Sequence, residues 1–178
     1  MTPQQVIAGL CRQYGRNLKL PQGSTLDGAK VLWALAGCES DFGARAVARH
    51  EPGYCYGHIY DPKELSGKWG CLAHCSYGPW QMMYPHLVTY SGIPITPMDF
   101  TIGAGWSGPG FTRAADRAAL AAKTMLNEEV LGRQQATTLE QIAKTWNHGN
   151  WRDDYDDSAY TDRAAKFYAT DFPAEATQ

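Results

Sequence analysis

The feature that most constrains the fold is an alanine-rich segment at residues 112–131, in which apolar residues recur at helical spacing. Apolar residues at positions i, i+3, i+4 and i+7 lie on one side of a helix, and alanine is the best helix former. The segment therefore predicts the clearest helix of the chain. The positions that carry the pattern are Ala115, Ala118, Ala119, Ala122, Met125 and Leu126.

The same periodicity, together with start and stop signals, predicts further helices. They cover residues 2–14, 24–40, 79–90, 138–147 and 158–169, with one helical turn near residues 98–102. Residues 43–77 are rich in Gly, Pro and Tyr, so we expect loops and at most a small β-hairpin there. The expected fold class is mainly α, a helical domain with a loop-rich insertion.

Length and composition favour one globular domain over residues 1–178, since a chain of 178 residues is in the usual range for a single domain. Apolar residues make up 44% and charged residues 19%, as in ordinary soluble proteins. The net charge of −2 disfavours nucleic acid as a partner, because nucleic-acid binders usually carry a basic surplus. No apolar run is long enough to predict a membrane span. We expect a monomer that needs no cofactor.

The first residues, Met1-Thr2-Pro3-Gln4-Gln5, contain no basic region followed by an apolar one. We therefore expect no standard secretory signal, and we expect the protein to be made in the cytoplasm.

Five cysteines leave at least one without an intramolecular disulfide partner. A metal-ligand interpretation applies to the closely spaced Cys55, His58, Cys71, His74 and Cys75. Their spacing fits no strong zinc template, so no metal site is predicted. Structural zinc, a disulfide and unpaired thiols remain three alternatives for this loop.

Glu39 continues the apolar stripe of its predicted helix, after Leu32, Leu35 and Ala36. A buried, unpaired carboxylate is costly, so the group must be neutral, paired or facing a cleft. An apolar setting raises a carboxyl pKa, and a protonated carboxyl group can act as a general acid. The alternative is an acid at a helix end that turns to water or pairs with Arg45.

Two other segments combine turn residues with a polar side chain. Gly78-Pro79-Trp80-Gln81 predicts a tight turn that carries Gln81 into a cleft, or a plain turn with a solvated amide. Trp146-Asn147-His148-Gly149 ends a periodic helix and is also an ordinary helix stop.

Taken together, these segments resemble the lysozyme-like superfamily, in particular the branch of soluble lytic transglycosylases and goose-type lysozymes. That branch has a Glu-Ser at a helix end, then a Gly-x-x-Gln motif, then an Ala-Tyr-Asn-Ala-Gly-like motif. Glu39-Ser40, Gly78-Pro79-Trp80-Gln81 and Trp146-Asn147-His148-Gly149 stand in this order, with the alanine-rich helix before the last one. The resemblance covers roughly residues 28–170 and implies a lysozyme-like fold for the single domain.

The resemblance also implies a function, cleavage of the MurNAc–GlcNAc β-1,4 bond in the glycan strands of peptidoglycan. Glu39 would be the general acid and then the base, and Ser40 would help to hold it. Gln81 and Asn147 would bind sugar amide and hydroxyl groups, and Tyr160 would tune Glu39. Trp80 and Trp146 would form apolar cleft walls. The protein would reach the cell wall after release by a holin, within a virion or through a secretion system.

Ser76 is an informative departure from the related segment of animal-type lysozymes, where an Asp precedes the Tyr-Gly-x-x-Gln residues. Without a second carboxylate, the sugar 6-hydroxyl can close the ring, which predicts a lytic transglycosylase that leaves 1,6-anhydro-muramyl ends. The candidates for a second carboxylate are Asp41, Glu51, Asp61 and Glu64. One of these in the site would give a hydrolytic lysozyme instead. A non-catalytic module that only binds glycan is a further alternative.

Overall fold

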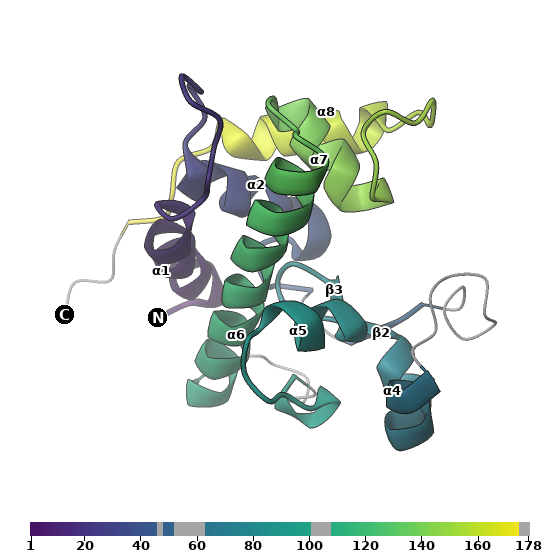
Figure 1. Cartoon of the computed structure of the whole chain (residues 1–178). Coiled ribbons are helices and arrows are strands. Elements are labelled where there is room, and N and C mark those ends of the chain that lie inside the picture. Colours follow the sequence, from purple (N-terminus) through teal and green to yellow (C-terminus); the bar gives the residue numbers. More distant parts are fainter. Residues whose placement is uncertain (46–47, 52–62, 101–107, 175–178) are drawn as a thin grey trace.

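The structure is a computed structural model that describes residues 1–45, 48–51, 63–100 and 108–174. The described residues are mostly helical, with one small antiparallel sheet (Figure 1). The prediction of a mainly α chain with a minor β part is therefore confirmed at this level. A search of the described helices for one long and apolar enough to cross a membrane finds none.

The α-helices of the described residues include the alanine-rich α6, which runs through the middle of the view in Figure 1 and packs against α1 and α5. They are α1 (Pro3–Gly15), α2 (Gly28–Ser40), α4 (Lys63–Trp69), α5 (Tyr84–Tyr90), α6 (Pro109–Met125), α7 (Leu139–His148) and α8 (Ser158–Tyr168). Short segments are the 3-10 helices η1 (Gly70–His74) and η2 (Pro97–Asp99) and the π-helical η3 (Leu126–Arg133), which extends α6. The strands are β1 (Arg49–His50), β2 (Cys75–Tyr77) and β3 (Met82–Met83).

Side-chain caps set where the first two helices begin. Thr2 and Gln5 form a reciprocal capping box at α1, in agreement with the helix predicted from residue 2. Asp27 caps α2, because its carboxylate accepts hydrogen bonds from the backbone N–H groups of Ala29 and Lys30. The predicted start of this helix at Ser24 is therefore wrong. The Ser24 hydroxyl instead accepts a hydrogen bond from the backbone N–H of Leu26, before the helix begins.

Helix α2 lies between α1 and α8 and packs against both. An aromatic cluster fixes α8 to the C-terminal half of α2: the ring of Trp33 stacks on Phe42 at 3.9 Å, and Phe42 meets Phe167 edge-on at 4.9 Å. The Trp33 indole N–H also donates to the hydroxyl of Thr170. This packing determines which residues of α8 lie beside the end of α2.

The sheet has the order β1-β2-β3, and Ser76 in its central strand pairs with Arg49 on one side and Met83 on the other. The helix predicted from Pro79 begins only at Tyr84. The residues between β2 and β3 form a turn in which Gly78 and Gln81 both have positive φ, and Met82 and Met83 then pair with β2. Pairing of Met82 and Met83 with β2 in this tight hairpin therefore overrides the helix signal of the same residues.

Residues 43–77 contain more regular structure than their composition predicts. Besides β1 and β2, this segment forms α4 and η1. The expectation of loops and at most a hairpin therefore misses a helix. Gly67 lies in α4 and Gly70 follows it, and glycine is a poor helix former, so the sequence of this segment does not indicate a helix. The tyrosines of this loop, Tyr54, Tyr56 and Tyr60, lie outside the described residues.

Replacing Gly78 with Ala is expected to lower the free energy of unfolding by about 1–3 kcal/mol. Gly78 has φ of 74°, and an added Cβ would lie 2.9 Å from the Cβ of Ala118 in α6. Gly9→Ala is the matched control: Gly9 lies inside α1 with nothing within 4 Å of an added Cβ, so we expect a gain of about 0.5–1 kcal/mol. Urea unfolding followed by circular dichroism measures both. Equal stability of the Gly78 variant and the wild type would contradict this account of the turn.

Candidate active site

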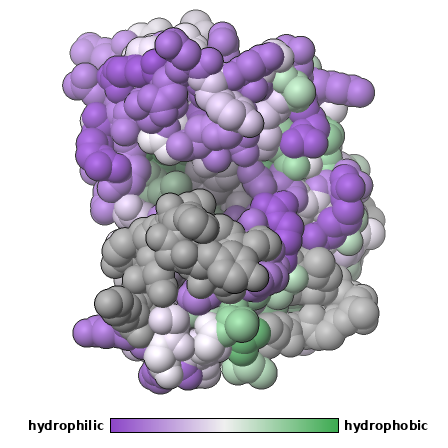
Figure 2. Space-filling view, turned by 90° about the vertical axis from the view of Figure 1, so that its right-hand side faces the viewer, coloured by the Kyte–Doolittle hydropathy of each residue, from purple (hydrophilic) through white to green (hydrophobic). Residues whose placement is uncertain are grey.

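A cleft of about 410 Å³ lies between the helical part of the molecule and the sheet. Figure 2 shows this side, where the surface is hollowed below a mostly hydrophilic upper part. The cleft is lined by residues of α2, β1, β3, α5, α6 and α7 and by the turn at Gln81. Its lining residues are Glu39, Arg49, Glu51, Gln81, Met82, Met83, His86, Met125, Thr145, Trp146, Asn147, His148 and Gly149.

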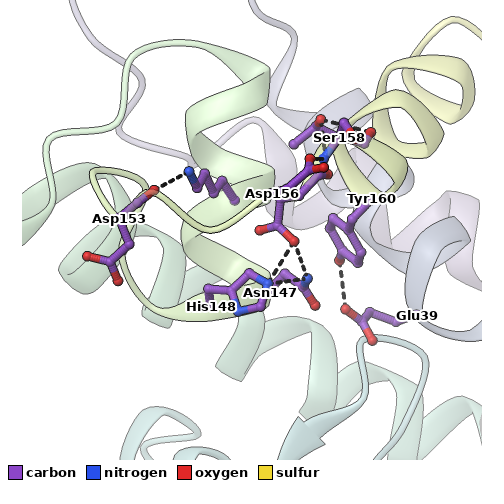
Figure 3. A network of polar contacts seen from close by, with 10 residues as sticks. Glu39, Asn147, His148, Asp153, Asp156, Ser158 and Tyr160 are labelled. Atoms are coloured by element: carbon purple, nitrogen blue, oxygen red, sulfur yellow. Dashed lines mark hydrogen bonds and ion pairs between the residues drawn. The ribbon is translucent and has the colours of Figure 1, made fainter.

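Glu39 lies in the last turn of α2, and its Oε1 accepts a hydrogen bond of 2.6 Å from the Tyr160 hydroxyl of α8 (Figure 3). The helix ends directly after it in two consecutive left-handed residues, Asp41 and Phe42, with φ of 52° and 53°. Non-glycine residues rarely adopt this conformation, and such strain concentrates at functional sites. Phe42 is held there by the aromatic cluster, so core packing maintains the turn that presents Glu39 to the cleft.

Burial raises the pKa of Glu39 above its usual value. The hydrogen bond from Tyr160 and the guanidinium groups of Arg49 and Arg163 act in the opposite direction, because they stabilise the charged form. The indole of Trp146 also lowers the pKa of Glu39. Desolvation is the largest influence, so the carboxyl group keeps its proton to higher pH than an exposed glutamate does. That is the property a general acid needs.

A second carboxylate, Glu51, lines the same cleft. Its Oε1 accepts a 2.9 Å hydrogen bond from the Ser76 hydroxyl and forms a 2.7 Å ion pair with Arg49 Nε. Of the other candidates for this role, Asp41 and Glu64 are exposed and do not line the cleft, and Asp61 lies outside the described residues. Ser76 therefore holds a carboxylate that is supplied by another segment of the chain.

Gln81 is buried at the floor of the cleft in a left-handed conformation, with φ of 43°. Its amide nitrogen donates to the carbonyl oxygen of Gly78 at 2.9 Å, and its oxygen lies 3.1 Å from the Ser76 hydroxyl. These bonds fix the orientation of the amide beside Glu51. The turn therefore does carry Gln81 into a cleft, one of the two outcomes that the sequence leaves open.

Two predicted residues lie behind the cleft surface. Ser40 is buried; its hydroxyl donates to the carbonyl of Pro79 at 2.7 Å and accepts from the N–H of Gly43. It therefore ties the end of α2 to the turn that bears Gln81, and it does not line the cleft. Trp80 is fully buried and its indole donates to the Leu32 carbonyl, so the expectation that it forms a cleft wall is wrong. Its place after a left-handed glycine turns it into the core.

The end of α7 supplies Trp146, Asn147 and His148 to the cleft. Asn147 Nδ2 donates to Asp157 Oδ1 at 2.9 Å, and His148 Nε2 lies 2.7 Å from the same oxygen. Figure 3 shows Asn147 and His148 side by side, near the pair of Tyr160 and Glu39. Asp157 is buried, so one carboxylate orients both side chains. Gly149, with φ of 82°, ends the helix at this point.

The cysteine and histidine cluster is described only in part. Cys55 and His58 lie outside the described residues. Cys71 is an exposed free thiol, His74 and Cys75 are buried, and Cys75 Sγ lies 3.4 Å from the Cys71 carbonyl oxygen. No group of three potential metal ligands is found among the residues that the structure does describe.

Arg49 and His86 also line the cleft, and neither is expected from the sequence. Arg49 reaches the cleft because β1 pairs with β2 opposite Ser76, and a two-residue strand has no detectable periodicity. His86 lies in the short helix α5 and is largely buried, which lowers its pKa. The sequence offers only one indication of a role for these residues: each has a side chain suited to binding or catalysis, a guanidinium or an imidazole, and lies close to one of the motifs.

Comparison with protein-family models, curated proteins and solved structures gives no match. The chemistry of the site is therefore inferred from the geometry described above.

Proposed function

We propose that this protein cleaves the MurNAc–GlcNAc β-1,4 bond in the glycan strands of peptidoglycan, with Glu39 as general acid. One observation carries the proposal: a carboxyl group with a raised pKa shares a cleft with a second carboxylate that is held in an ion pair. Most glycosidases use two carboxyl groups that lie in different environments.

The first step follows from the position of Glu39. It gives its proton to the glycosidic oxygen, the bond from C1 to that oxygen breaks, and positive charge develops on the sugar ring. Glu39 is then a carboxylate, and the Tyr160 hydroxyl at 2.6 Å stabilises this charge. The fixed amides of Gln81 and Asn147 are suited to hydrogen bonding with the N-acetyl and hydroxyl groups of the sugars. Trp146 provides an apolar wall.

The second step depends on Glu51, and its presence in the cleft favours hydrolysis. A carboxylate near C1 takes the proton from an attacking water molecule or stabilises the ring cation. Lytic transglycosylase chemistry remains the second candidate. It is favoured by Ser76, which has no charge of its own, and in that reaction the 6-hydroxyl of the muramyl residue attacks C1 in place of water.

The arrangement of the elements supports a lysozyme-like fold as part of this proposal. An acid at the end of α2 is followed by a small antiparallel sheet that contains the Gly-x-x-Gln turn. The alanine-rich α6 and the Trp-Asn pair at the end of α7 come next, and all three motifs meet at one cleft.

Mass spectrometry of purified peptidoglycan digested with the protein tests the proposal directly. Reducing muramyl ends are expected, and 1,6-anhydro ends would instead support the transglycosylase. Binding to cell walls without new ends of either kind would overturn the proposal in favour of a glycan-binding module. Cleavage of chitin oligomers but not of peptidoglycan would point to a different glycan.

Replacing Tyr160 with Phe is expected to move the alkaline limb of the pH–activity profile to higher pH. The Tyr160 hydrogen bond lowers the pKa of Glu39, so its removal raises that pKa, and the protonated acid survives to higher pH. The other charged groups that act on Glu39, Arg49 and Arg163, are unchanged in this variant. The measurement is kcat/KM against pH.

Tyr90→Phe is the matched control for this variant. It removes a hydrogen bond of the same kind, 3.0 Å from the Tyr90 hydroxyl to Glu129, at a position that does not line the cleft. Its profile should overlay that of the wild type. A Tyr160→Phe profile that moves to lower pH, or does not move, would show that this hydroxyl does not act on the catalytic acid.

A further inference from the structure

A second pocket, of about 440 Å³, continues the cleft on the other side of Glu39. The two cavities share Glu39, Arg49, Gln81 and Asn147, so they form one groove that passes the acid. Residues that belong to the second pocket alone include Arg45, Tyr160 and Arg163. A ligand lying along the groove would therefore contact both the catalytic acid and these residues.

Three guanidinium groups line this second pocket, from three different elements. Arg45 follows the end of α2 and is exposed, Arg49 lies in β1, and Arg163 lies in α8. The Arg163 guanidinium is held 5.4 Å from the centre of the Tyr160 ring, which positions it next to Glu39. Arg45 and Arg163 come together because α2 packs against α8, and Arg49 lines the same pocket from β1.

The positive charge of this pocket is only partly compensated. Glu51 forms an ion pair with Arg49. In the described part of the chain, no carboxylate forms an ion pair with Arg45 or Arg163. The remaining acid of the pocket is Glu39, whose burial favours its neutral form. Since the whole chain has a net charge of −2, this concentration of arginines is a local feature and not a consequence of composition.

We propose that Arg45 and Arg163 form an anion subsite that binds a carboxylate of the glycan substrate, on a muramyl residue next to the bond that is cleaved. The inference rests on the proposed function and names the group that the site recognises. The planar fork of a guanidinium matches a carboxylate in shape, and it is always charged. A neutral glycan such as chitin offers no such group.

Two carboxylates of peptidoglycan have this chemistry. A muramyl residue without a stem peptide carries a free lactyl carboxylate, and a residue with a stem peptide carries the carboxylates of that peptide. Both project from the same sugar, so the test uses stripped strands and intact strands, each in native form and with its carboxyl groups converted to amides.

The experiment measures kcat/KM for these substrates with wild type and the double variant Arg45→Gln, Arg163→Gln. The wild type is expected to prefer native over amidated strands by roughly 10- to 100-fold, the value of one charge-assisted contact. The double variant should lose this preference. If the double variant loses the preference on stripped strands, the bound group is the lactyl carboxylate. If it loses the preference only on intact strands, the bound group is a carboxylate of the stem peptide. Arg16→Gln, which removes an exposed arginine outside both pockets, should keep it.

Two outcomes would overturn the inference while leaving the proposed function intact. One is a wild type that cleaves native and amidated strands equally well. The other is a double variant that keeps the full preference of the wild type. If the wild type cleaves none of the strands, the proposed function fails, and the anion subsite fails with it.

Discussion

Replacing Glu39 with Gln is expected to lower the rate of peptidoglycan cleavage by about 10²–10⁴-fold, the usual contribution of a general acid. The amide has the shape of the carboxyl group and still accepts the Tyr160 hydrogen bond, but it has no proton to give to the leaving oxygen. The release of new saccharide ends per unit time, followed by mass spectrometry, measures the loss. Glu128→Gln is the matched control, because Glu128 is exposed on η3 and does not line the cleft.

The same variant should be at least as stable as the wild type, which separates loss of chemistry from loss of fold. Burial raises the pKa of Glu39 in the folded state above its value of 4.5 in the unfolded chain. The wild type therefore loses stability as pH rises between these two values, and Gln avoids that loss. Thermal unfolding should give similar midpoints for both proteins at about pH 4, and a higher midpoint for the variant at about pH 7. Full activity of a folded Glu39→Gln protein would remove Glu39 from the mechanism.

The helices were predictable from sequence where local signals determine them. The capping box at Thr2 and the apolar stripes of α6 and α7 depend on residues within a few positions of one another. The positions of Glu39, Gln81 and Asn147 on one cleft follow from three short motifs, and the structure does bring these residues together. Tyr160, which rested on the family resemblance alone, also reaches Glu39.

The features that sequence could not supply depend on contacts between distant segments. The sheet consists of strands of two or three residues, and its register, which sets Ser76 opposite Arg49, comes from pairing across 27 positions. The start of α5 at Tyr84 has a different origin, because the preceding Met82 and Met83 form β3 and pair with β2 in a hairpin. Trp80 is buried against α2, where its indole donates to the carbonyl oxygen of Leu32, 48 positions away. No local pattern indicates that Glu51 is the carboxylate that Ser76 holds.

Replacing Glu51 with Gln is expected to lower the yield of reducing muramyl ends by about 10²-fold or more, because hydrolysis then lacks its second carboxylate. The amide keeps the contact with the Ser76 hydroxyl but loses the charge that pairs with Arg49. Any cleavage that remains should shift toward 1,6-anhydro ends, since Glu39 can still protonate the leaving oxygen and the sugar 6-hydroxyl needs no protein carboxylate beside C1. Mass spectrometry distinguishes the two ends by the mass of one water molecule.

Glu64→Gln is the control for this variant, because Glu64 is an exposed carboxylate of α4 that does not line the cleft. It should leave both the rate and the products unchanged. If the wild type itself releases 1,6-anhydro ends and Glu51→Gln does not alter them, then the Ser76–Glu51 pair is a structural contact of the sheet and the enzyme is a lytic transglycosylase. The ratio of the two ends therefore decides whether Glu51 acts in the reaction as a second carboxylate.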